Sequence, residues 1–440
     1  MPKTSLRQHH AGHLALVASL ASIPLSIEAS SLYRNGIGAR SMSLTGSDVA
    51  VASDPMGAMY ANPAGLAYLS RPEVQLGGTV GYVHGTFDNA ANNGATLNNW
   101  GAIPELAFGL PLGDSPVTLG LSFLPEAALS ADWTYTDAPG GLGGVSYGNQ
   151  THRSDITVLR SALGAAVKLG EKWSLGASVG LIYNDNKLQA PYIFQNTPLA
   201  GAKTLLDLNT DGFGVNAHFG AIYRPNDRWQ FGVSYRTETS VRSRGDATGD
   251  VGTQLAVPSV PFHYDAQVNN HFPQMATAGA AWQFHPRWRW SMQLDWINWS
   301  DSFDRLPVKL YNGSNPGVNA AMGSSTVEDE VPLNWKDQFV YRTGIEYAAS
   351  EEWKLRAGYS YGNSPVPDAT LTPMTAAITE HTLGLGAGWQ RSRYTLDFGY
   401  QVELPAEQSV GVSALRSGEY NNSRTGIQIH WFTVTTSVKF

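Results

Sequence analysis

Hydrophobic and polar residues alternate along most of the chain beyond residue 72. In the segment KWSLGASVGLIY, Trp173, Leu175 and Val179 fall on one face of an extended strand, and Ser174 and Ser178 fall on the other. The same alternation recurs in RWQFGVSYR, RWRWSMQLDW, EWKLRAGYSY and RYTLDFGYQV. A period of two predicts antiparallel β-strands with one apolar and one polar face.

Aromatic residues mark both ends of these strands. One set follows short turns: Trp173, Trp229, Trp288, Trp353 and Tyr394; a second set lies near the opposite strand ends: Tyr183, Tyr235, Trp296, Tyr359 and Tyr400. Alternation alone would also suit a soluble β-sandwich. Two aromatic girdles around an apolar band instead indicate strands that cross an outer membrane.

Loop lengths support this interpretation. Short turns (GDS, GEK, PND, HPR, SEE and RSR) alternate with long segments, as in barrels with short periplasmic turns and long extracellular loops. Candidate strands lie near 73–85, 106–112, 116–124, 156–168, 172–184, 212–223, 228–239, 274–284, 287–298, 337–347, 352–361, 380–390, 393–402 and 426–440. The predicted fold class is all-β: an antiparallel transmembrane β-barrel of about 14 strands over residues 73–440.

Residues 1–29 have the layout of a secretory signal peptide. Lys3 and Arg7 precede the apolar stretch LALVASLASIPL, and the small residues of SIEAS follow, with cleavage expected after Ala29. No later run of about 18 apolar residues could form a transmembrane helix. We therefore expect a Gram-negative outer-membrane location, reached with the assembly machinery that recognises a terminal aromatic such as Phe440.

Composition and motifs narrow the function. The net charge is -7, so no broad basic surface suits nucleic acid. The chain has no cysteine, which excludes cysteine-based catalysis and cysteine ligands for zinc. It also lacks HExxH and GxSxG, and GGLGG is not followed by the Lys-Ser/Thr of a phosphate loop. We expect no enzyme activity, no cofactor and no metal; a barrel-embedded lipase would need its Ser and His on separate strands.

Residues 30–72 precede the first strand and read differently. Asp54-Pro55 and Asn62-Pro63 each place a capping side chain before a proline, which predicts two short helices. Such a compact, apolar segment needs a surface to pack against, and the lumen of a wide barrel offers one. We expect a plug, here called the hatch; the alternative is a periplasmic extension outside the barrel.

The residues resemble the FadL/TodX-type outer-membrane transporters of long-chain fatty acids and other hydrophobic compounds. The likeness rests on GIGARSMSLTGSDVAVASDPMGAMYANPAGLA, with Asn62, Pro63 and Ala64 as the hatch motif, and on WINWSD, WKDQFVYRTG and GYSYGNSPVPD in family order. It implies passive, ligand-gated uptake, most of all of long-chain fatty acids, with lateral release through the barrel wall. Aromatic hydrocarbons are the alternative substrates.

The resemblance also implies a basic residue near a bound carboxylate. Lys336 in WKDQF matches a family segment with such a lysine, and Arg342 follows it; both could instead be lumen residues paired with Asp337 or Glu346. At a second basic family position, only Lys187 is nearby.

Two long loops carry many apolar residues, among them Tyr192, Phe194 and Phe262, which suggests a hydrophobic groove at the mouth. Lys203 lies near them in sequence and could meet a carboxylate there, although the loops could simply pack on each other.

Other functions remain open from the sequence. A hydrophilic diffusion porin would lack the hatch, and a surface adhesin or structural barrel would not need it. The expected partners are a hydrophobic small molecule, outer-membrane lipid and lipopolysaccharide, and the assembly machinery, with the protein as a monomer.

Overall fold

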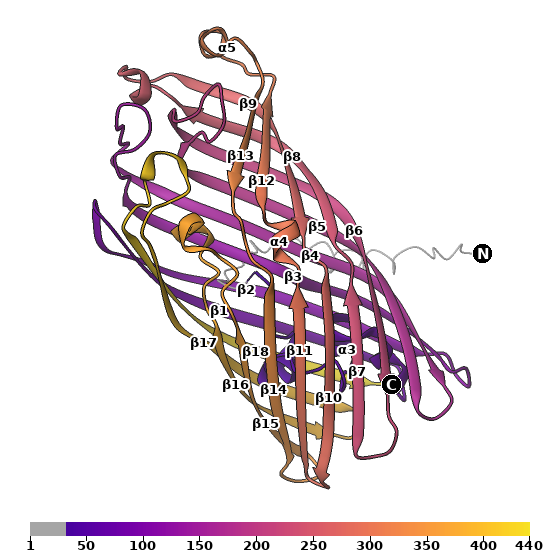
Figure 1. The fold of residues 1–440 in the computed structure, drawn as a ribbon. Helices are drawn as coiled ribbons and strands as arrows, with labels where there is room; N and C mark the ends of the chain where they lie inside the picture. The colour runs from indigo at the N-terminus through magenta and orange to yellow at the C-terminus, as the bar shows by residue number, and fades with distance from the viewer. Residues whose placement is uncertain (1–31) are drawn as a thin grey trace, which may run out of the picture.

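Fourteen antiparallel strands close into a barrel in the computed structural model, which describes residues 32–440 (Figure 1). They are β1 (Glu73–Asn89), β2 (Asn92–Pro111), β3 (Val117–Thr136), β4 (Asn149–Leu169), β5 (Trp173–Ile193), β6 (Lys203–Tyr223), β7 (Trp229–Arg236), β10 (Met275–His285), β11 (Trp288–Ile297), β14 (Gln338–Ala348), β15 (Trp353–Gly362), β16 (His381–Arg391), β17 (Tyr394–Val410) and β18 (Ser423–Lys439). Strand β1 pairs with both β2 and β18, which closes the barrel. The predicted fold class is confirmed, whereas the expected signal peptide at 1–29 lies outside the described residues.

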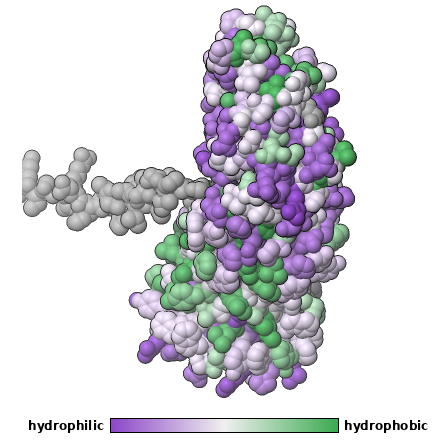
Figure 2. Space-filling view, turned by 90° about the vertical axis from the view of Figure 1, so that its left-hand side faces the viewer, coloured by the Kyte–Doolittle hydropathy of each residue, from purple (hydrophilic) through white to green (hydrophobic). Residues whose placement is uncertain are grey.

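On the face that Figure 2 shows, apolar residues gather over the lower half of the barrel, the end at which Figure 1 places the short turns. In β5 the side chains of Leu175 and Val179 are exposed, and those of Ser174 and Ser178 are buried inside, as the alternation predicts. Trp173 stacks on Tyr223 at 4.4 Å between ring centroids, next to a short turn. An exposed apolar band bordered by aromatic rings is the lipid-facing surface of an outer-membrane barrel, and the short turns mark its periplasmic end.

Four further strands extend the sheet above this band: β8 (Thr239–Asp250), β9 (Pro261–Phe272), β12 (Arg305–Tyr311) and β13 (Val327–Pro332). The upper part of β6 pairs with β8, which pairs with β9; β9 pairs with β12, and β12 with β13. The sequence analysis predicts loops for most of these residues, and in that detail the prediction is wrong. In β9 the apolar residues Tyr264 and Val268 face inward and His263 faces outward, because this part of the wall meets water outside.

Strand β6 shows the change of environment within one strand. Its upper residues Leu206 and Leu208 are 5% and 4% exposed and face the interior. Its lower residues Phe213 and Val215 are 61% and 62% exposed and face outward. The apolar face of the strand therefore switches sides between Leu208 and Phe213, which places the outer edge of the lipid-facing band there.

The hatch lies inside the lower barrel and contains α2 (Gly38–Ser43), α3 (Pro55–Ala61) and the 3-10 helix η2 (Pro63–Tyr68). Both predicted caps are confirmed: Asp54 accepts a hydrogen bond from the Gly57 N–H, and Asn62 accepts one from the Ala64 N–H. None of the helices within residues 32–440 is long and apolar enough to cross a membrane.

The barrel wall lacks side chains at many positions where it surrounds the hatch. Glycines lie on the inner side of eleven barrel strands at this level, and a Cβ added at any of them would lie within 3.0 Å of a hatch atom. We call them the glycine ring: Gly109, Gly120, Gly164, Gly176, Gly220, Gly232, Gly279, Gly344, Gly358, Gly384, Gly386 and Gly399. At Gly176 that Cβ would lie 2.3 Å from the Ala64 nitrogen. The wall can therefore approach the hatch backbone directly, which explains part of the high glycine content.

Candidate functional site

An apolar cavity of about 170 Å³ lies inside the upper barrel, above the hatch. Its wall includes Leu206 and Leu208 of β6, Val268 of β9 and Leu310 of β12. The hatch also contributes, since Leu32 lines the same cavity. The cavity is apolar because the upper strands turn their hydrophobic side chains inward.

A second apolar cavity, of about 410 Å³, lies at the extracellular mouth. It is bordered by residues 251–262 and by α5 (Pro316–Met322). Phe194, Leu310 and Val327 line both cavities, so these three side chains form a shared wall. The mouth and the interior thus adjoin through an apolar partition.

The three predicted aromatic residues lie at these cavities. Tyr192 lines the inner cavity, Phe262 lines the mouth cavity, and Phe194 lines both. The Tyr192 hydroxyl donates a hydrogen bond of 2.6 Å to Asp329, which fixes the orientation of its ring. Their contact with a ligand stays a prediction.

The three predicted basic residues do not converge on the inner cavity. Lys336 is exposed and does not line the cavity, although its neighbour Trp335 does. The suggested partner of Lys336, Asp337, instead accepts hydrogen bonds from Ser300 and Trp296. Burial would raise the pKa of Asp337, but these hydrogen bonds outweigh it and lower the pKa.

Arg342 lies lower in the lumen and is engaged by the hatch. Its Nε is 2.5 Å from Asp295 Oδ2, and its guanidinium also donates to Asn35 and to the Thr45 carbonyl. The suggested partner Glu346 pairs instead with Arg289 and other arginines. Arg342 thus links the hatch to the wall.

Lys203 is fully buried near the extracellular end of the barrel. Its Nζ is 2.6 Å from Asp137 Oδ1, 3.6 Å from Glu419 Oε1 and 2.8 Å from the Ala138 carbonyl. These partners occupy the ammonium group, so a ligand carboxylate would have to displace one of them.

Two other basic residues border the inner cavity, Lys187 and Arg416. Lys187 is exposed on the outward face of β5, opposite Asp155 of β4, so its side chain points away from the cavity. Arg416 donates a hydrogen bond from its Nε to the Gln195 carbonyl and forms no salt bridge with an acidic side chain within residues 32–440. Arg416 also borders a polar cavity of about 370 Å³, which Arg305 and Glu330 line as well. No sequence signal points to Arg416, which begins the short 3-10 helix η6 (Arg416–Gly418) before β18.

The barrel wall has an unpaired stretch between β2 and β3, which we call the window. The two strands pair only from Leu106 opposite Phe123 down to the short turn. Above that point β3 continues to pair with β4, across a bulge between Pro125 and Ala127, while β2 stays with β1. The window ends at the top, where Asn92 and Thr136 exchange hydrogen bonds.

The first residues of the hatch lie against this window. The Leu32 carbonyl accepts a hydrogen bond of 2.9 Å from the Ala128 N–H of β3. Arg34 pairs with Glu105 of β2 at 3.4 Å, and both side chains are buried. The start of the hatch therefore contacts the inner cavity through Leu32 and both sides of the window.

The closed barrel, its plug and the apolar cavities define an outer-membrane β-barrel protein that transports hydrophobic compounds. The family model of outer membrane protein transport proteins (OMPP1/FadL/TodX) matches residues 21–438. The chain therefore belongs to the OMPP1/FadL/TodX family, as the resemblance suggested, and its outer-membrane location is confirmed. Members of this family are transport channels rather than enzymes.

Individual relatives are distant in sequence. The long-chain fatty acid transport protein of Escherichia coli O6:H1 is 22% identical over 352 residues, which are 72% of this chain and 73% of that protein. Alkane uptake protein A of Marinobacter nauticus is 22% identical over 247 residues, 52% of this chain and 50% of that protein.

Solved structures share the fold. The Pseudomonas putida toluene transporter TodX aligns with a TM-score of 0.72 and 19% identity, covering 92% of this chain and 99% of that one. A Pseudomonas aeruginosa FadL homologue aligns with a TM-score of 0.73 and 16% identity, covering 93% and 100%. At these identities the likeness establishes the fold and leaves the substrate open.

Proposed function

We propose that this protein takes up long-chain fatty acids passively, through a route gated by the hatch. The observation that carries the proposal is the pair of adjoining apolar cavities with one basic side chain, that of Arg416, at the inner one. An alkyl chain fits an apolar lining, and a carboxylate fits a cation that has no acidic partner.

The proposed route begins at the mouth cavity and passes Phe194 into the inner cavity. Each buried CH₂ contributes about 0.8 kcal/mol, so a long alkyl chain favours these cavities strongly over water. The polar cavity beside Arg416 gives the headgroup a hydrated place while the tail occupies the apolar space.

The proposed exit is lateral, through the window between β2 and β3. The lower edge of the window lies between Leu106 and Phe123, which are exposed on the lipid-facing side. An opening there releases the alkyl chain into the bilayer, whereas a straight aqueous channel would return it to water. Because Leu32 touches both the cavity and β3, ligand binding and a shift of the first hatch residues are coupled in this proposal.

Aromatic hydrocarbons are the second candidate substrates. The inner cavity is lined by Phe272, Phe303 and Trp335 in addition to its aliphatic residues, and such rings also suit a flat apolar ligand. Toluene carries no charge that the Arg416 guanidinium could bind, and this distinguishes the two candidates.

Uptake of radiolabelled oleate and of labelled toluene, in cells that lack their own importer, tests the proposal. The variant Arg416→Ala should reduce oleate uptake about tenfold or more, because it removes charge-assisted hydrogen bonds to the carboxylate. Lys336→Ala is the matched control, since this lysine is exposed and lies outside the cavity. Equal loss in both variants would support the family-based role of Lys336 instead, and toluene uptake alone would assign the protein to hydrocarbons.

Steady ion conductance in a planar bilayer would favour a diffusion porin, and normal cell binding after deletion of the hatch would favour an adhesin. We further expect a monomer that contacts lipopolysaccharide and uses the outer-membrane assembly machinery.

A further inference from the structure

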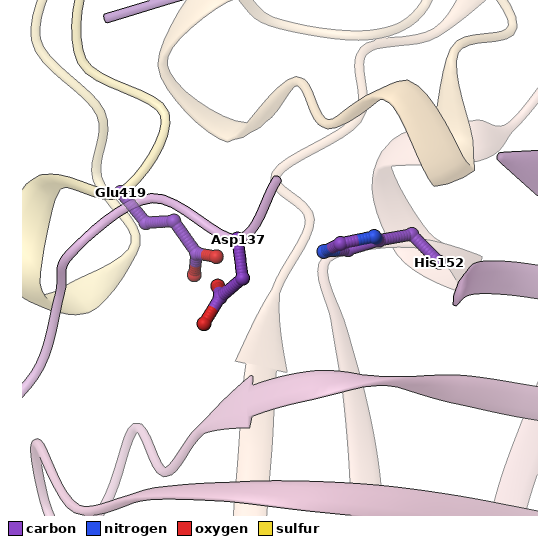
Figure 3. A group of neighbouring side chains, drawn as sticks. All are labelled: Asp137, His152 and Glu419. Carbon is purple, nitrogen blue, oxygen red and sulfur yellow. The ribbon is translucent and has the colours of Figure 1, made fainter. Parts of the chain in front are cut away.

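Three segments far apart in the chain bring metal-ligating groups together near the extracellular end of the barrel (Figure 3). Asp137 follows β3, His152 lies near the start of β4, and Glu419 belongs to the loop before β18. One ligand atom from each lies within 4.8 Å of the others. Asp137 and His152 are fully buried, and Glu419 is half-buried.

His152 points a free nitrogen into this group. Its Nδ1 lies 3.2 Å from the Gln150 carbonyl, which can only accept, so Nδ1 carries the proton and Nε2 keeps its lone pair. Nε2 is buried and has no hydrogen-bond partner within the part of the chain that the structure describes. Figure 3 shows the tip of the ring directed at the Asp137 carboxylate.

A histidine held in this way is arranged as a metal ligand. In metal sites the second ring nitrogen commonly donates to a main-chain carbonyl, which fixes the tautomer and the ring orientation. Here the flat face of the His152 ring also stacks on Tyr135 at 3.5 Å between centroids, so the ring cannot easily turn away.

The structure assigns Asp137, His152 and Glu419 as a binding site for a divalent transition-metal ion such as Zn²⁺. Zn²⁺ binds imidazole nitrogen and carboxylate oxygen at about 2.0–2.2 Å, so its ligand atoms lie at most about 4 Å apart. Movements of about 1 Å by the side chains would close the present group to that size. Ca²⁺ and Mg²⁺ prefer oxygen ligands and would leave the imidazole unused.

The Lys203 ammonium group would compete with a metal ion for this site. Its ammonium group contacts both carboxylates, through Asp137 at 2.6 Å and Glu419 at 3.6 Å. It also donates to the carbonyls of Ala138 and Val145, so it keeps partners when a metal takes the carboxylates. The sequence spacing gave no hint of the site, because the three ligands lie on separate segments.

A bound metal would link three segments near the extracellular end of the barrel. Glu419 and its neighbour Tyr420 line the inner cavity, so the site lies in the cavity's roof. The assignment does not depend on which hydrophobic compound is transported.

Equilibrium dialysis of the full-length protein in detergent, purified without a histidine tag, tests the assignment. We expect the wild type to bind one Zn²⁺, and His152→Gln to weaken the binding by about 100-fold or more. His271→Gln is the matched control: this exposed histidine lies 3.2 Å from Glu238, and its loss should leave binding unchanged. Lys203→Met should tighten binding about tenfold or more, because the competing charge is gone.

X-ray absorption of the wild type loaded with Zn²⁺ gives a readout that does not depend on any variant folding. We expect a shell of nitrogen and oxygen atoms that includes one imidazole. Failure of the wild type to bind Zn²⁺, a spectrum without imidazole, or unchanged affinity in a correctly assembled His152→Gln protein would each overturn the assignment.

Discussion

Replacement of Asn62 by alanine should loosen the hatch without unfolding the barrel. The fully buried side chain of Asn62 accepts a hydrogen bond from the Ala64 N–H and caps η2. Its amide also donates to the carbonyls of Val49 in the hatch and of Ala221 and Val233 in the wall. The residue is thus both a helix cap and a tether.

The magnitude follows from these bonds. Loss of the cap costs about 1 kcal/mol. The amide has two N–H groups and so makes two full hydrogen bonds, each contributing about 1 kcal/mol. The total of about 3 kcal/mol raises the population of the displaced hatch roughly 100-fold.

Single-channel recordings in planar lipid bilayers measure that population as the fraction of time in an open, ion-conducting state. Asn62→Ser serves as the matched variant, because serine keeps the cap and loses the tether, so an increase of about 30-fold is expected. Heat-modifiable mobility on gels checks that the barrel is assembled. If both variants of Asn62 conduct like the wild type, the hatch is not held by these bonds and the reasoning fails.

Three more substitutions test the route and its gate. Phe194→Ala removes the ring shared by the two cavities and should speed the initial uptake of oleate; slower uptake would show that the ring guides the ligand. Arg34→Gln leaves Glu105 buried without its ion pair, which costs about 3–5 kcal/mol, and should increase the proteolysis of the first hatch residues. Gly220→Val adds a side chain whose Cβ alone would lie 1.9 Å from Asn62 Oδ1, so the hatch should be displaced and conductance should rise; a barrel that stays non-conducting would contradict the packing described for the hatch.

The membrane part of the fold was predictable because lipid imposes one simple pattern. Residues such as Leu175 and Val179 must face lipid, so their spacing reveals each strand. Above the membrane that rule no longer applies, and Tyr264 and Val268 of β9 turn inward instead. The same alternation therefore appeared as an apolar loop, and the extra strands were missed.

The candidate site was less predictable because it depends on register and on distant segments. The predicted residue Lys336 directly follows Trp335, which lines the cavity. Adjacent residues in an extended chain point in opposite directions, so Lys336 points away from it. Lys203 lies among the predicted apolar groups in sequence, but its charge is taken up by Asp137, 66 residues away. Arg416 and His152 acquire their surroundings only through tertiary packing.

The switch of the apolar face on β6 has a consequence for the energetics of transport. Leu206 and Leu208 line the inner cavity above the level at which Phe213 first meets lipid. On the proposed route a hydrophobic solute therefore leaves water while it is still outside the membrane. The large fall in its free energy occurs there, and the headgroups and packed chains of the outer leaflet form no barrier in its path.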